Sequence, residues 1–216
     1  MFPRLFSTLI ISLIASWPLI SHAELESNYM KMDYQHIRSW NQFVDEVYDL
    51  HKEQISGKQI VTQEKLGGYV RQPEFYKQVT YIDKASGKPV SIIQWVKDKP
   101  DVIHSLEVLV RDDQGRVIRD YSAAYLPGRR NAPVQTLINV HNYNDKLHAF
   151  RQYDVSTDVI YEYCEGEFQG KKHQLRLFEN DLTAANYEAR QVLNSPLYKA
   201  CFNGLPQQLG KYIDPQ

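Results

Sequence analysis

Apolar and polar residues follow a helical period early in the chain and a two-residue period through its middle. Between Tyr34 and Ile55, apolar residues including Val44 and Val47 recur at steps of three and four residues. This spacing places them along one side of an amphipathic helix. We therefore predict a helix over residues 34–55. His51 lies on or near its apolar stripe, where a packed core histidine is favoured over a ligand.

From Phe75 to Phe178 the period changes to two, which is typical of β-strands. Turns rich in Gly, Asn and Asp reverse the chain between successive strands. The predicted strands span residues 75–82, 89–97, 102–111, 116–126, 133–141, 147–154, 158–166 and 172–178. The segment before them, with Gly67-Gly68 and Pro73, is expected to be a linker.

Helical signals return after Asn180. Thr183 is expected to cap a helix that runs to about Leu193, and Ser195-Pro196 to open a short helix that ends near Phe202. The predicted fold class is α+β: an N-terminal amphipathic helix packed on an antiparallel β-meander of about eight strands in four hairpins, followed by C-terminal helices. An open sheet is favoured over a closed barrel, because the helix stripe needs a surface on which to bury.

The two faces of a central strand differ in polarity. Val102, His104, Leu106, Val108 and Val110 form one nearly apolar face, whereas the alternate residues of that strand are mixed. A sheet that is wet on one side usually alternates more cleanly. The second face is therefore expected to be partly covered by the helices, a ligand or a partner.

Residues 1–23 have the pattern of a cleavable secretory signal peptide rather than a membrane anchor. Arg4 precedes an apolar stretch that is shorter than the roughly 20 residues needed to span a bilayer. Ser21-His22-Ala23 then provides the small residues that signal peptidase reads. We predict cleavage near Ala23, a single domain over residues 24–216, a periplasmic or secreted location, and no stable membrane span after cleavage.

Charge and cysteine content narrow the classes of protein further. The 216-residue chain has 25 Lys and Arg against 26 Asp and Glu, and this balance argues against a nucleic-acid binder. The two cysteines, Cys164 and Cys201, lack the spacing of a redox or metal motif. In an oxidising compartment they are expected to form a structural disulfide.

The familiar catalytic and cofactor motifs are absent from the sequence, so it indicates no catalytic residue and no cofactor. One metal site is conceivable at His141 and His148. A four-residue loop over 143–146 would place the two imidazoles opposite each other on one hairpin face. A third ligand would have to come from Asp145 or His173; the alternative is two solvated histidines near a turn.

Two further groups of residues could carry chemistry. Glu162, Glu165 and Glu167 surround Cys164, and paired carboxylates can do acid–base work. A solvated, charge-balanced edge beside the following lysines is the favoured interpretation. The loop residues Arg129, Arg130 and Asn131 could clamp a carboxylate or phosphate, or simply form a solvated loop.

The sequence favours an exported, non-catalytic binding or adaptor protein that presents a curved β-sheet to an envelope protein partner or an apolar ligand. One alternative is an exported hydrolase with a dispersed active site, which predicts a polar pocket with a histidine near a carboxylate or hydroxyl. A metal-handling periplasmic protein built on His141 and His148 is the other.

Overall fold

The structure, a computed structural model, describes residues 34–127, 131–183 and 187–209. The chain divides into two compact units, 1–34 and 35–216. Apart from Tyr34, the first unit lies outside the described residues, and the predicted signal peptide lies there with it. Of the described helices, none is long and apolar enough to cross a membrane.

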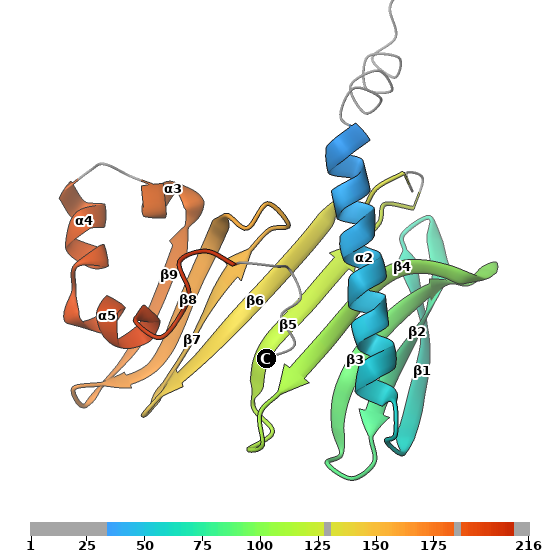
Figure 1. Cartoon of the computed structure of the whole chain (residues 1–216), viewed down its shortest axis with the longest axis horizontal. Coiled ribbons are helices and arrows are strands. Elements are labelled where there is room, and N and C mark those ends of the chain that lie inside the picture. The colour runs from blue at the N-terminus through green and yellow to red at the C-terminus, as the bar shows by residue number, and fades with distance from the viewer. Residues whose placement is uncertain (1–33, 128–130, 184–186, 210–216) are drawn as a thin grey trace, which may run out of the picture. The chain divides into compact units, whose positions relative to one another are not determined.

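The described part of the second unit contains one long helix, an antiparallel sheet and three short helices (Figure 1). In chain order the elements are α2 (Tyr34–Ile55), β1 (Ile60–Tyr69), β2 (Gln72–Asp83), β3 (Lys88–Val96), β4 (Lys99–Arg111), β5 (Val117–Ala124), β6 (Gln135–Asn144), β7 (Leu147–Tyr153), β8 (Val159–Phe168), β9 (Lys171–Phe178), α3 (Glu179–Thr183), α4 (Tyr187–Leu193) and α5 (Pro196–Phe202). The strands pair in sequence order from β1 to β9 as a meander. The predicted α+β fold is confirmed.

Strand β1 is the one that the sequence pattern missed. It pairs with β2 on one side, and its residues are mostly exposed, Val61 and Leu66 among them. A strand that buries neither face has no need for alternating polarity, so its sequence resembled a linker. The sheet therefore has nine strands among the described residues instead of the predicted eight.

Helix α2 has the predicted bounds and packs on β3, β4 and β5 (Figure 1). Phe43 and Val47 are fully buried in the same cluster as Val108. His51 is also buried, and its Nδ1 lies 2.7 Å from the Oγ of Ser91. The interpretation of His51 as a packed core histidine is confirmed.

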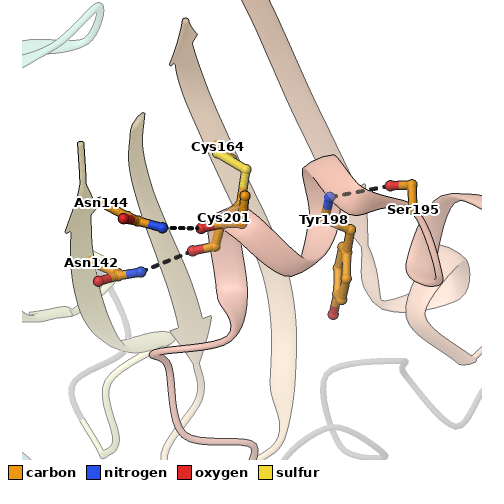
Figure 2. The surroundings of a disulfide bond; sticks show 7 residues. Asn142, Asn144, Cys164, Ser195, Tyr198 and Cys201 are labelled. Carbon is orange, nitrogen blue, oxygen red and sulfur yellow. Dashed lines mark hydrogen bonds between the residues drawn. A yellow bond between two sulfur atoms is a disulfide. The ribbon is translucent and has the colours of Figure 1, made fainter. Parts of the chain in front are cut away.

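Helix α5 packs against β6 and β7 and extends this same core. Its buried residues Cys201 and Phe202 belong to the cluster that contains the α2 side chains. The helix begins as predicted, because the Ser195 side chain accepts a hydrogen bond from the Tyr198 amide (Figure 2). Helices α2 and α5 therefore cover one face of the sheet.

The predicted disulfide between Cys164 and Cys201 is present and joins β8 to α5 (Figure 2). Two side-chain amides of β6 add to this attachment. The Nδ2 of Asn142 donates to the carbonyl of Cys201 at 3.1 Å, and the Nδ2 of Asn144 donates to the carbonyl of Ala200 at 3.0 Å. Helix α5 is thus fixed to the sheet covalently and by hydrogen bonds from side-chain amides of β6 to its carbonyls.

A buried ion pair holds the segment after α5. Arg151 of β7 donates through Nε to Oε1 of Glu162 on β8 at 2.6 Å, and through Nη1 to the carbonyl of Pro206 at 2.6 Å. The hydroxyl of Tyr198 donates to the same Glu162 oxygen. Burial, reinforced by the charge of Glu162, raises the pKa of Tyr198 to about 12, so the phenol keeps its proton.

Two details of the sequence interpretation are wrong. Thr183 was expected to precede a helix as its cap, but it is the last residue of α3, and its hydroxyl donates to the carbonyl of Glu179. In β4, an irregular register opposite Gln94 places one extra residue in the strand. Ile103 consequently packs against the core, while His104 leaves the predicted apolar face.

Candidate functional site

We call the sheet face opposite α2 and α5 the outer face. Residues that pair across neighbouring strands form rows on this face. Its central rows carry Glu107, Asp120, His141 and Phe150. Most of these side chains are half-buried. Helices α2 and α5 lie on the opposite face and do not provide the cover that was expected for this second face. Cover by a ligand or a partner stays a prediction.

A depression of about 490 Å³, which we call the groove, lies on the outer face over β2 to β6. We call its half-buried amides and small side chains the floor: Gln78, Gln94, Ser105, Ser122 and Ala124. Its rim includes Tyr69, Leu126 and Val134, which are 43%, 44% and 53% exposed. The groove therefore offers apolar contact at its edge and hydrogen-bonding groups at its base.

An aromatic cluster forms one wall of the groove. The hydroxyl of Tyr69 lies 2.6 Å from Nε2 of His104. The His104 ring in turn stacks on Tyr76 and meets Phe75 edge-on. The bulge in β4 makes this cluster possible, because it turns His104 toward the outer face.

Glu107 is the acidic residue that lines the groove. It makes no hydrogen bond or ion pair within the described residues. Burial raises the pKa of the Glu107 carboxyl, and the neighbouring Asp120 raises it further. A half-buried carboxyl without a partner is a group available for ligand recognition.

A chain of hydrogen bonds runs from Asp120 to the two histidines. Asp120 accepts from Asn139 Nδ2 and from His141 Nε2, each at 2.7 Å. An ionised carboxylate can only accept, so we assign the proton to Nε2 of His141. Its Nδ1 then accepts from Nε2 of His148, 3.0 Å away.

In a neutral His148 whose proton is on Nε2, the Nδ1 atom has no proton and its lone pair is available. Burial lowers the pKa of His148, as does the neighbouring His141, while Glu165 acts in the opposite sense. His148 is therefore biased toward the neutral imidazole that can act as a base or a ligand. Asp120 and His141 hold its tautomer as the third group of a catalytic triad would.

The histidine pair differs in detail from the predicted metal site. Asn144 pairs with Leu147, so the hairpin turns through two residues and His148 lies opposite Tyr143. His141 and His148 are diagonal neighbours, and the nitrogens that would chelate a metal share a hydrogen bond instead. Over the ranges that the structure describes, no group of three or more His, Cys, Asp or Glu is placed to hold a metal ion.

A second depression, of about 620 Å³, lies at the ends of the hairpins beside His148. Asp145, His173, Glu165 and Glu167 all line it, so several sequence candidates meet there. Their charges are largely engaged: Glu167 accepts from Lys146 Nζ at 3.0 Å, and Glu165 accepts from the Tyr163 hydroxyl at 2.7 Å. Glu162 does not join them, because it is buried on the other face with Arg151.

The predicted contact loop is described only in part. Arg129 and Arg130 lie outside the described residues. Asn131 is exposed, and its carbonyl accepts a hydrogen bond from the Nδ2 of Asn41 in α2 at 2.7 Å. Its observed role is therefore to tie this loop to the helix, and a role in ligand contact stays a prediction.

Sequence reasoning missed the groove and Glu107. The groove draws residues from several strands, so no local motif marks it. The mixed polarity of residues 103–111 was the signal available, and it identified the face without the site. Comparison with known protein families, with curated proteins and with solved structures finds no match.

Proposed function

We propose that the protein is an exported, non-catalytic binding protein that holds a small, partly apolar ligand in the groove on its outer face. The observation that carries this proposal is the groove itself, with an apolar rim and a floor of hydrogen-bonding groups around an unpartnered carboxyl, Glu107. Ligand sites in proteins are typically concave and combine apolar walls with a few convergent polar groups.

The size of the groove favours a small molecule over a protein partner. Its volume of about 490 Å³ falls within the ~300–1,000 Å³ typical of small-molecule sites. Its floor also presents half-buried amides and hydroxyls, with which a small molecule in the groove can form hydrogen bonds. A ligand with an apolar body and one polar group would satisfy both regions.

Export accords with the disulfide, because such bonds persist in oxidising compartments. The test is mass spectrometry of protein isolated from its native cell. We expect a mature chain that begins at Glu24 and carries an oxidised Cys164–Cys201 pair. A chain that retains Met1 would contradict export.

Binding in the groove is tested by identifying small molecules that co-purify with the protein. Ser122→Phe fills the groove floor and should abolish retention of the bound molecule. Gln174→Phe adds the same bulk at an exposed site on β9 and should leave retention intact. Equal retention by both variants, or protein that never carries or binds a small molecule, would contradict the proposal.

A second function is favoured by one observation, the Asp120–His141–His148 chain beside the second depression. His148 could serve there as the general base of a hydrolase that activates water. A panel of chromogenic esters would test it. Turnover that is lost in His148→Gln and in Asp120→Asn would support a hydrolase, whereas turnover unaffected by either change would exclude this base.

A further inference from the structure

Among the residues that the structure describes, the charges that line the groove are of one sign. Of the described residues that line the groove, none is a lysine or an arginine, and Glu107 is the one carboxyl. Asp120 lies in the next cross-strand row and adds its negative charge to the electrostatic environment of Glu107. The nearest guanidinium along β4, that of Arg111, is occupied at the strand end by the carbonyls of Pro89 and Gly115.

We propose that the groove selects an organic cation, an ammonium or guanidinium group on an apolar body, with the Glu107 carboxylate as its counter-charge. This inference rests on the proposed ligand-binding function of the groove. A cation removes the repulsion between Glu107 and Asp120 and supplies the hydrogen-bond donors that Glu107 lacks within the described residues.

The aromatic wall favours the same ligand class. Tyr69 is 43% exposed and is fixed by its hydroxyl contact to His104. A tyrosine ring face attracts a nearby cation through its quadrupole, and more strongly where water is partly excluded. An anionic ligand would meet only like charge at Glu107, and a neutral one would leave the carboxylate charge uncompensated.

The experiment compares three probes of nearly equal shape: cyclohexylmethylamine, cyclohexylmethanol and cyclohexanecarboxylate. Their affinities are measured by titration of amide resonances, which also report whether each probe contacts the groove. We expect the amine to bind about tenfold to hundredfold more tightly than the alcohol, the range of a charge-assisted hydrogen bond. The carboxylate should bind more weakly than either.

Glu107→Gln keeps the shape of the side chain and removes its charge. It should lower amine affinity to that of the alcohol while leaving alcohol affinity unchanged. Glu165→Gln is the matched control: it removes another carboxylate from the outer face, one that contacts Tyr163, and should leave amine binding unchanged. The free energy of unfolding of both variants establishes that each is folded.

A measurement on the unaltered protein makes the inference independent of any variant. Amine affinity should fall with rising salt and also with falling pH, as Glu107 takes up a proton. Because burial raises the pKa of Glu107 above its ordinary 4.5, this loss should begin above the usual carboxyl range.

The outcomes separate the two proposals. Amine preference that depends on Glu107 and on pH supports the cation site. Equal binding of all three probes in the groove, unaffected by Glu107→Gln, overturns the cation inference and leaves the groove as a binding site. Absence of groove shifts with every probe at millimolar concentration counts against both.

Discussion

Replacing Arg151 by methionine should destabilise the fold by far more than the loss of an ordinary ion pair. Arg151 and Glu162 are 0% and 1% exposed in side-chain area. Removal of the guanidinium leaves the Glu162 carboxylate buried. Among the described residues, the donor that remains to it is the Tyr198 hydroxyl, 3.2 Å away. A buried charge that loses its partner typically costs about 3–5 kcal/mol of unfolding free energy, and we expect Arg151→Met to fall in that range.

The double variant Arg151→Met/Glu162→Leu should be more stable than the single one. Removing the carboxylate as well eliminates the uncompensated charge, and apolar replacements of buried ion pairs are often neutral or stabilising by about 1–4 kcal/mol. The carbonyls of Leu205 and Pro206 still lose the donor that Arg151 provides at 3.1 and 2.6 Å. We therefore expect the double variant to recover most of the loss, with a cost of about 1 kcal/mol remaining for these acceptors.

Urea unfolding followed by tryptophan fluorescence measures these free energies. Lys77→Met provides a control, because Lys77 and Glu64 form an exposed pair, 43% and 55% accessible, whose loss should cost under about 1 kcal/mol. The reasoning fails if Arg151→Met costs no more than this control. It also fails if the double variant is no more stable than the single one.

Three further predictions concern the disulfide, a buried histidine and a glycine. The bond between Cys164 and Cys201 spans 37 positions, so reduction should lower the unfolding free energy by about 4 kcal/mol in the chain-entropy model; an unchanged urea midpoint would contradict it. Burial, with a smaller effect of the adjacent lysine, lowers the pKa of His51 below 6.5, so the unfolded chain binds the proton more readily and stability should fall as the pH drops below that value. His51→Asn should flatten this part of the pH–stability curve, and an identical slope in both proteins would refute the assignment. Gly166 has φ 139° and a substituted Cβ would lie 2.1 Å from a main-chain oxygen, so Gly166→Ala should cost at least about 1–3 kcal/mol in thermal unfolding; Gly170→Ala, with open space around it, should cost less.

Elements that bury one face were predictable from the sequence, and elements that bury none were not. The stripe of α2 had to match a core, so its period gave the bounds Tyr34–Ile55 correctly. The exposed edge strand β1 left no such pattern. Thr183 shows a similar limit: threonine is favoured before a helix begins, but its hydroxyl can also bond to the carbonyl four residues earlier within a helix, as it does to Glu179.

The site depended on register, which here is set by a turn length and a bulge that the periodicity of the sequence does not locate. A two-residue turn in place of four changed His141 and His148 from directly opposite to diagonal neighbours. One extra residue in β4 moved His104 from the expected core face to the groove wall. The first change moves the partner of His141 by two residues, so both histidines stay on the same face. The second is a change of one residue, which exchanges the faces of a strand.

The two faces of the sheet divide stability from recognition. The disulfide, the Arg151–Glu162 pair and the α2 stripe all lie on the helix-covered face, where the buried charge of Glu162 is paired with that of Arg151. Glu107 is the opposite case: its charge is disfavoured by burial and by Asp120, and no described residue pairs with it. A position shaped by stability alone would hold a neutral residue there, as its cross-strand partners Ile92 and Ser122 illustrate. Because groups held at a cost to the fold are typical of functional sites, the carboxyl of Glu107 is the strongest reason to place ligand recognition in the groove.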